Sequence, residues 1–252
     1  MTASLVDILA PRLAPLDLDH RLVLVREIIP GRIVFTTSFG IEDQFITHSI
    51  FTQGLDIEIV TIDTGRLFPE TYDLWERTEA RYARRIRAAY PKAEPLEALV
   101  EEQGVNGFYK SVEARKACCH VRKVEPLGRL LAGVSGWVTG LRADQSDARA
   151  DAPLIAFDAA RKLLKINPVA DYSRDAIVAA AEDLSIPVNE LHAKGYLSIG
   201  CAPCTRAIAP GESERAGRWW WEQDDKKECG LHVGEDGVLR RGPASPEKQE
   251  TR

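Results

Sequence analysis

The sequence lacks the marks of a membrane protein, a secreted protein or a nucleic-acid-binding protein. It contains no uninterrupted apolar run long enough to span a bilayer, and no basic segment followed by an apolar one. Its formal net charge is −5, whereas proteins that bind DNA or RNA usually carry a basic surface. We therefore expect a soluble, cytoplasmic protein that binds neither membranes nor nucleic acid.

Two common nucleotide-binding signatures are also missing. The sequence has neither the G-x-x-x-x-G-K-[ST] pattern of phosphate-binding loops nor the G-x-G-x-x-G pattern of dinucleotide-binding folds. It shows no internal repeat. A chain of 252 residues is long enough for one sizeable core, so we expect a single domain followed by a C-terminal extension.

Cysteine is scarce, but its placement is informative. Of the five cysteines, Cys118 and Cys119 are adjacent, and Cys201 and Cys204 form a C-x-x-C pair. In a reducing compartment such pairs are more often metal ligands or catalytic groups than disulfides. A four-cysteine zinc site and a 4Fe-4S cluster both fit this set, although adjacent ligands are unusual for structural zinc. Packing of the thiols as small apolar groups is a third interpretation.

Three predicted strands each run into a polar loop. The strands, each given with its loop, are residues 32–36 with 37–43, 57–62 with 63–66, and 136–140 with 141–149. The carboxyl ends of parallel strands face one crevice, which is where open α/β sheets bind ligands. The first loop contains a serine and a glycine before a predicted helix, a layout that suits an anion. An ordinary strand-to-helix turn has the same composition.

The remaining apolar periodicity predicts helices that cover the sheet, together with further strands. The helices are expected as two short ones within 3–29 that are broken around Pro11 to Pro15, and then at 44–51, 69–85, 94–102 and 174–184. The further strands are expected at 85–90 and as a pair within 154–166. Five arginines are expected to lie on a solvated face, at positions 77, 81, 84, 85 and 87.

Four cations surround the adjacent cysteines, namely Arg115, Lys116, Arg122 and Lys123. Positive charge lowers the pKa of a thiol and compensates an anionic cluster or ligand. If the segment continues as a helix, Lys123 lies four residues beyond Cys119 and near the same face. A surface lysine is the alternative.

The C-terminal part differs in composition from the rest of the chain. Trp219, Trp220 and Trp221 are consecutive and cannot all face one core, so at least one is expected to line a pocket or a protein contact. Charged residues and glycines follow from position 222, which is typical of a mobile tail. Cys229 stands alone within this tail.

Several motifs together resemble one known family. They are Cys118-Cys119-x-x-Arg122-Lys123, Ser198-x-Gly200-Cys201-x-x-Cys204-Thr205, residues 215–222, Glu228-Cys229-Gly230-Leu231-His232, and the loops Ser38-Phe39-Gly40 and Asp63-Thr64-Gly65-Arg66. Over roughly residues 30–233 the chain resembles the assimilatory adenylyl-sulfate reductases, relatives of the phosphoadenylyl-sulfate reductases. The resemblance implies an α/β fold like that of the adenine-nucleotide alpha hydrolases, a parallel sheet flanked by helices. It also implies a 4Fe-4S cluster on Cys118, Cys119, Cys201 and Cys204.

The resemblance further implies a reaction, the thiol-dependent reduction of adenosine 5'-phosphosulfate to sulfite and AMP in sulfate assimilation. Cys229 would be the nucleophile, with His232 beside it, and an S-sulfocysteine would form on the enzyme. Thioredoxin or glutaredoxin would then release sulfite. Residues 1–222 would form the nucleotide-binding reductase domain with the iron-sulfur site, and residues 223–252 the mobile tail that carries Cys229.

The same resemblance implies the substrate-binding residues. They are Ser38, Phe39, Gly40, Asp43, Asp63, Gly65, Arg66, Lys123, Gly140, Arg142, Arg149, Arg215 and Arg218. The cations among them would bind the phosphate and sulfate oxygens through charge-assisted hydrogen bonds. The loop 38–43 departs from the S-G-G-x-D-S loop of pyrophosphate-releasing relatives, because it lacks the paired glycines. This departure fits an enzyme that does not adenylate its substrate.

Two rival functions and one assembly question remain open at this point. The nearest rival is a 3'-phosphoadenylyl-sulfate reductase or an enzyme that accepts both nucleotides. The paired cysteines favour the unphosphorylated substrate, because they are typically absent from the 3'-phosphate enzymes. The other rival is a non-catalytic, zinc-stabilised nucleotide-binding module. Members of the family are often oligomers, so a homo-oligomer is possible.

Overall fold

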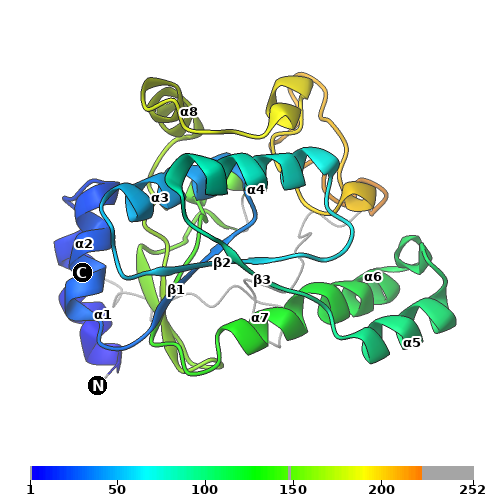
Figure 1. Cartoon of the computed structure of the whole chain (residues 1–252), viewed down its shortest axis with the longest axis horizontal. Helices are drawn as coiled ribbons and strands as arrows, with labels where there is room; N and C mark the ends of the chain where they lie inside the picture. Colours follow the sequence, from blue (N-terminus) through cyan, green and yellow to red (C-terminus); the bar gives the residue numbers. More distant parts are fainter. Residues whose placement is uncertain (1, 147–148, 223–252) are drawn as a thin grey trace, which may run out of the picture.

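The computed structural model describes residues 2–146 and 149–222. Its centre is a six-stranded sheet in the order β3-β2-β1-β4-β6-β5. All neighbouring strands are parallel except β5, which pairs antiparallel with β6 at one edge. Helices lie on both sides of the sheet, with α3 and α4 above it and α5, α6 and α7 below it in Figure 1. The expected fold, a mostly parallel sheet flanked by helices, is confirmed.

The strands are short, and the central strand β1 pairs with β2 on one side and with β4 on the other. Their bounds are β1 Ile33–Thr37, β2 Glu58–Ile62, β3 Arg87–Ala89, β4 Gly136–Val138, β5 Ile155–Asp158 and β6 Leu163–Ile166. Val34 of β1 pairs with Glu58 of β2 on one side and with Trp137 of β4 on the other. Because these strands are parallel, their carboxyl ends lie together on one side of the sheet.

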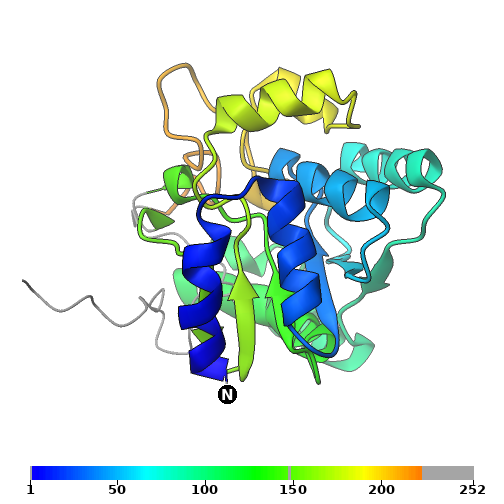
Figure 2. The ribbon, with the colours of Figure 1, turned by 90° about the vertical axis from the view of Figure 1, so that its left-hand side faces the viewer.

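The helices connect and cover these strands. Their bounds are α1 Thr2–Leu13, α2 Leu18–Ile28, α3 Ile41–Thr52, α4 Pro69–Tyr82, α5 Ala93–Gln103, α6 Val112–Cys119, α7 Glu125–Leu130 and α8 Arg174–Asp183. Short 3-10 turns lie at η1 Gly107–Tyr109, η3 Ala143–Gln145, η5 Glu190–Lys194 and η6 Ala202–Cys204, and a π-helical turn, η2 His120–Val124, joins α6 to α7. Figure 2 shows α1 and α2 side by side, and α1 packs on β5 and β6 at the edge of the sheet.

Alternation along the strands divides the interior into two cores. In β1, Ile33 and Phe35 belong to the larger core under α1, α2, α3, α4 and α8, whereas Val34 belongs to the smaller core under α7. Successive side chains of a strand point to opposite faces of the sheet, so a strand that is apolar at every position must be covered on both faces. The unbroken apolar run Ile33-Val34-Phe35 is thus explained by helices on both sides.

Most predicted elements are found within a few residues of their expected bounds, and two differ for local reasons. Helix α1 continues through Pro11 to Leu13, and the break comes later, where Asp17 accepts a hydrogen bond from His20 N and caps α2. Helix α3 begins at Ile41 rather than Gln44, because Gly40 is its N-cap. The five arginines predicted to be solvated, at positions 77, 81, 84, 85 and 87, are exposed.

None of the helices in residues 2–146 and 149–222 is long and apolar enough to cross a bilayer.

Candidate functional site

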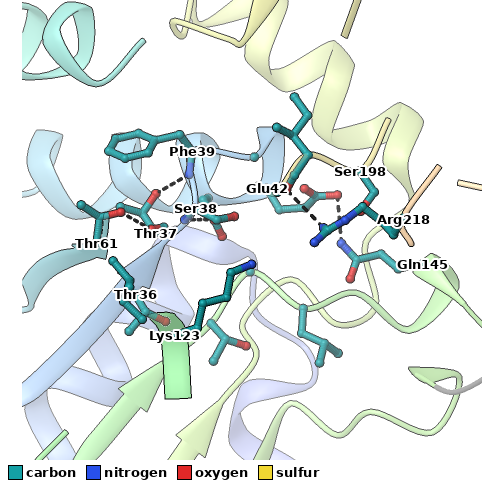
Figure 3. Close-up of a pocket in the computed structure, with 18 of the residues that line it drawn as sticks. Thr36, Thr37, Ser38, Phe39, Glu42, Thr61, Lys123, Gln145, Ser198 and Arg218 are labelled. Atoms are coloured by element: carbon teal, nitrogen blue, oxygen red, sulfur yellow. Dashed lines mark hydrogen bonds between the residues drawn. The ribbon is translucent and has the colours of Figure 1, made fainter. Parts of the chain in front are cut away.

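A pocket of about 190 Å³ lies at the carboxyl ends of β1, β2 and β4, and we call it the strand-end pocket. The loop after β1, the loop after β4, the end of the π-helical turn and the segment 197–219 form its walls. Predicted site residues that line it are Ser38, Phe39, Gly40, Asp43, Lys123, Gly140, Arg149, Arg215 and Arg218. Figure 3 shows Lys123 projecting into it from below the loop that contains Ser38.

A buried carboxylate braces the first loop of the strand-end pocket. Asp43 accepts hydrogen bonds from Ser38 N at 2.6 Å and from Ser38 Oγ at 2.7 Å, which closes the loop between β1 and α3. Burial raises the pKa of Asp43 to about 7, against the opposing effect of the two Ser38 hydrogen bonds. Neighbouring Glu42 raises the pKa of Asp43 further. The first turn of α3 therefore holds a carboxyl group whose pKa is raised by burial.

Phe39 contributes to this wall in an unusual backbone conformation. Its φ of 61° lies in the left-handed region, which bulky residues rarely adopt. The Phe39 ring is buried and stacks on Trp75, with ring centroids 5.5 Å apart, and Phe39 N donates to Thr37 Oγ1. Strain of this kind persists only where the surroundings enforce it, and it is frequent at functional sites.

Two glycines in the pocket walls leave room for charged groups. A Cβ atom at Gly140 would overlap the Asp43 carboxylate, and one at Gly200 would overlap the Arg218 guanidinium. The guanidinium of Arg218 lies 4.7 Å from the centre of the Trp219 ring and donates to Ile199 O at 3.3 Å. Its Nε is buried without a hydrogen-bond partner among the described residues. Arg218 is thus held by stacking on Trp219, and its Nε–H remains available to donate a hydrogen bond.

Arg142 lies elsewhere than predicted. Its guanidinium is fully buried behind the strand-end pocket, where it pairs with Glu42, Asp144 and Glu214, and it is not among the residues that line the pocket. Arg149 does line the pocket, and it donates to Gln145 Oε1 at 2.6 Å. Of the two arginines predicted in this loop, the structure brings only Arg149 to the pocket surface.

The loop after β2 reaches the strand-end pocket through Thr64 and Leu67, and its predicted site residues lie elsewhere. Asp63 accepts hydrogen bonds from Gly65 N and Tyr72 Oη, each at 2.8 Å, and Gly65 has a φ of 69°, so the turn is an Asp-capped turn that needs glycine. Arg66 donates to Val105 O and lies over the Phe108 ring. None of Asp63, Gly65 and Arg66 lines the pocket.

The four predicted ligand cysteines line a second, smaller cavity, which we call the cysteine cavity. Cys118 and Cys119 end α6, whereas Cys201 precedes η6 and Cys204 is its last residue. Lys123 and Trp219 line both this cavity and the strand-end pocket. The two sites therefore share a wall, and Lys123 belongs to both.

Electrostatics within the cysteine cavity differ from thiol to thiol. Burial, and after it the nearby Cys201, raise the pKa of Cys204 to about 12. Burial would also raise the pKa of Cys201, but Lys123, the Thr64 hydroxyl at 3.3 Å and Arg218 together lower it below its usual value. Cations from both sites thus stabilise a thiolate at Cys201.

The donor set of the cysteine cavity fits a thiolate-bound cluster. Four thiols with no carboxylate among the lining residues suit soft metals and iron-sulfur clusters, and Arg115, Arg122 and Lys123 supply compensating positive charge. Within residues 2–146 and 149–222, no group of three or more His, Cys, Asp or Glu side chains is arranged to hold a metal ion. The fit therefore rests on the chemistry of the four thiols and their cations.

A buried ion pair secures the far wall of the cysteine cavity. Arg115 Nε donates to Glu222 Oε1 at 2.5 Å, and the Arg115 guanidinium lies 4.6 Å from the Trp219 ring centre. Arg122 Nη1 donates to Thr64 O at 2.6 Å, which ties the π-helical turn to the loop after β2. Trp219 is buried and lines both cavities, whereas Trp220 is exposed, so at least one of the three tryptophans lines a pocket as expected.

Several pocket residues were not identified from the sequence. They are Thr36, Thr37, Thr61, Thr64, Thr139, Gln145 and Glu214. The threonines stand at or just beyond the ends of the predicted strands, a position that could have marked them. Cys229 and His232, the predicted nucleophile and its neighbour, lie outside the described residues.

The fold and site define an α/β protein whose sheet carries a cation-lined pocket at its carboxyl edge and a thiol-lined cavity beside it. The family described as "Phosphoadenosine phosphosulfate reductase domain" matches residues 32–207. The chain belongs to this family.

Curated relatives extend the similarity to most of the chain. An adenosine 5'-phosphosulfate reductase of Agrobacterium fabrum is 57% identical over 233 residues, which cover 92% of this chain and 88% of that protein. One of Allochromatium vinosum is 54% identical over 200 residues, covering 79% and 78%. The resemblance to the adenylyl-sulfate reductases is thereby confirmed, and with it the expectation that the chain is an enzyme.

A solved structure supports the fold. The phosphoadenylyl-sulfate reductase of Candida auris, in a phosphate complex, superposes with a TM-score of 0.69 at 26% identity, covering 81% of this chain and 96% of that one.

Proposed function

We propose that the protein reduces adenosine 5'-phosphosulfate to sulfite and AMP in sulfate assimilation. The observation that carries the proposal is the shared wall between the two sites. A pocket lined by Lys123, Arg149, Arg215 and Arg218 adjoins a cavity lined by four cysteines, in a chain 57% identical to adenosine 5'-phosphosulfate reductases. The substrate carries negative charge on phosphate and sulfate, which these four cations suit.

In this proposal the nucleotide occupies the strand-end pocket. The phosphosulfate lies among the four cations, and each charge-assisted hydrogen bond contributes on the order of 1.5–3 kcal/mol. Ser38 and Gly40 of the loop after β1 face the same space, and the Asp43 carboxylate, which also lines the pocket, accepts a hydrogen bond from Ser38 Oγ. In this proposal Asp63, Gly65 and Arg66 do not contact the nucleotide. They hold the loop after β2 in its conformation.

We further propose that Cys118, Cys119, Cys201 and Cys204 hold a 4Fe-4S cluster. When bound, such a cluster would supply a negatively charged inorganic centre whose role is structural or electrostatic. Lys123 would couple its charge to the substrate, because this side chain lines both sites. The remaining cations, Arg66, Arg115 and Arg122, line the cysteine cavity alone.

The proposed nucleophile is Cys229, on a tail of residues 223–252 that follows the domain 1–222. Its thiolate attacks the sulfur of the sulfate group, an S–S bond forms, and the bond from sulfur to the bridging oxygen breaks. AMP leaves with that electron pair. A thiolate of thioredoxin or glutaredoxin then attacks the Cys229 sulfur, and sulfite leaves with the electron pair of the S–S bond. The second thiol of the reductant resolves the mixed disulfide, so that the dithiol supplies both electrons.

Mass spectrometry tests this proposal. Protein mixed with adenosine 5'-phosphosulfate in the absence of reductant is expected to gain the mass of one sulfonate on Cys229 and to release AMP. The Cys229→Ser variant should bind the nucleotide without gaining mass. A wild-type protein that stays unmodified without reductant, yet releases sulfite once a dithiol is added, would contradict the mechanism.

A second candidate function is reduction of the 3'-phosphorylated nucleotide. It is favoured by the name of the matched family and by the Candida auris structure, both of which refer to that substrate. Sulfite release measured with each nucleotide separates the two, and we expect the unphosphorylated one to be preferred. A brown colour and broad visible absorption in anaerobically purified protein would exclude a zinc-stabilised, non-catalytic module.

A further inference from the structure

The guanidinium of Arg142 is fully buried among carboxylates that belong to three separate segments. Its Nε lies 2.8 Å from Glu42 Oε1, its Nη2 lies 2.7 Å from Glu214 Oε2, and its Nη1 pairs with Asp144. Glu42 is in the first turn of α3, Asp144 is in η3, and Glu214 lies in segment 197–219, which we call the C-terminal segment. One side chain therefore joins three parts of the fold.

Each joined segment also carries a wall of the strand-end pocket. Glu42 precedes Asp43, which braces the loop after β1. Glu214 precedes Arg215 and lies four residues before Arg218, and both of these arginines line the pocket. Arg174 of α8 gives Glu214 a second cation, with its Nη1 3.4 Å from Glu214 Oε1. The position of the C-terminal arginines is thus tied to the central sheet through Glu214.

Because the Arg142 guanidinium is buried, each of its N–H groups needs a hydrogen-bond partner. A buried guanidinium stays charged, and its N–H groups must be paired because an unpaired buried charge is strongly destabilising. All three guanidinium nitrogens of Arg142 already face carboxylates. Its pKa is raised, because Glu42 and Glu214 outweigh the effect of burial. Arg142 is therefore held behind the pocket. It contacts residues of the pocket walls and does not reach a ligand in the pocket.

We propose that Arg142 is a positioning residue, which fixes Arg215 and Arg218 for an anionic ligand by holding Glu214. The inference rests on the proposed function in one respect, that the ligand of the strand-end pocket is an anionic nucleotide. Glu42 and Glu214 are then required for anion binding even though they are themselves negative. This requirement separates positioning from a direct electrostatic contribution.

The direction in which one substitution changes anion affinity distinguishes positioning from a direct electrostatic contribution. Glu214 lines the pocket, so removing its charge would tighten anion binding if charge alone mattered. Positioning gives the opposite result. In Glu214→Gln the side chain keeps its shape, but an amide NH₂ must face either Arg142 or Arg174, so one of the two contacts is lost. The C-terminal segment is then released, and binding weakens.

The matched control is Glu212→Gln. Glu212 lies two residues away on the same segment and carries its own arginine pair, with Arg206 Nη2 2.8 Å from Glu212 Oε1. This pair is open to solvent, with 37% of the Arg206 side chain and 33% of the Glu212 side chain exposed, and Glu212 is not among the pocket-lining residues. An exposed pair contributes little, so the control is expected to bind within about twofold of wild type.

The experiment is calorimetric titration of the intact, anaerobically purified protein with ADP, an unreactive diphosphate analogue of the phosphosulfate. We expect Glu214→Gln to bind ADP about tenfold more weakly than wild type, in line with the effect of small misplacements of binding groups. Arg142→Lys, which keeps the charge but not the three-way contact, should show a similar loss. Binding by Glu214→Gln that equals or exceeds wild type would overturn the inference.

Amide hydrogen exchange of the unliganded proteins gives a second readout that needs no ligand. Residues 215–218 should exchange about tenfold faster in Glu214→Gln and Arg142→Lys than in Glu212→Gln. Unchanged exchange in both variants would overturn the inference. If wild type does not bind ADP, the proposed function fails, and the exchange rates alone then decide the role of Arg142.

Discussion

The strand-end pocket and the cysteine cavity share Lys123 and Trp219, yet their cations face different groups. In the cysteine cavity Arg122 and Lys123 stand against thiols, and these cations lower the pKa of Cys201 against the effect of burial. In the strand-end pocket Arg149, Arg215 and Arg218 line a space of about 190 Å³, and the carboxylates of Glu42 and Asp43 lie in its walls. The comparison shows that one group of cations lies against thiols on one side and lines an open pocket on the other.

The largest expected effect comes from removing a thiol on the cysteine side. In Cys201→Ser a ligand of the proposed cluster is replaced by a hydroxyl, so iron and labile sulfide should be lost together with the visible absorption. Sulfite production should fall at least about a hundredfold, because segment 197–219 forms a wall of both sites. Iron analysis and absorption spectra check this. Full iron content in the variant would contradict the assignment of Cys201.

The next largest effect is expected from Gly200→Ala, which acts on the pocket side. The added Cβ would overlap the Arg218 guanidinium, so this donor must move away from the pocket. Nucleotide affinity should fall about ten- to a hundredfold. Gly128→Ala is the control, because a Cβ there meets no atom within 4 Å. Equal affinity in the two variants would show that Arg218 is not a ligand.

Lys123→Ala tests the shared wall itself. We expect about a tenfold rise in KM for the nucleotide, because one charge-assisted contact is lost. A shift of the absorption or electron paramagnetic resonance spectrum should accompany it, because the same ammonium faces the thiols. Lys116→Ala, an exposed lysine of α6, is the matched control. A change in only one of the two readouts would mean that Lys123 serves a single site.

The last prediction concerns stability and pH and does not involve activity. The pKa of Asp43 is about 7 in the folded protein and near 4 when unfolded, so the folded state binds the extra proton between these values. The free energy of unfolding of wild type, relative to Asp43→Asn, should therefore fall as the pH rises from 4 to 7, by on the order of a few kcal/mol. Urea unfolding at pH 5 and pH 8 measures the difference. A difference between the two proteins that does not change with pH would contradict the buried acid.

Much of the fold could be predicted because its signals are local. The apolar run at 32–36 corresponds to β1 at Ile33–Thr37, and the alternating segments within 154–166 correspond to β5 and β6. The helix predicted at 174–184 is found at Arg174–Asp183, and Ser173, which precedes it, accepts a hydrogen bond from Ala176 N and caps it. Each of these features depends on residues within a few positions of one another.

The pocket was only partly predictable because its contacts are distant in sequence. Arg142 stands in a polar loop after a strand, where an arginine that binds ligand looks the same as one that binds carboxylates. Its partners Glu42 and Glu214 are 100 and 72 residues away. Only the tertiary fold shows that these carboxylates meet it.

Assay of the Cys229→Ser variant with adenosine 5'-phosphosulfate and a dithiol reductant tests the central claim most directly, namely that four cysteines hold the cluster and the fifth reacts. The account predicts that the variant keeps its brown colour, binds the nucleotide as wild type does and produces no sulfite. Sulfite production at the wild-type rate would contradict it.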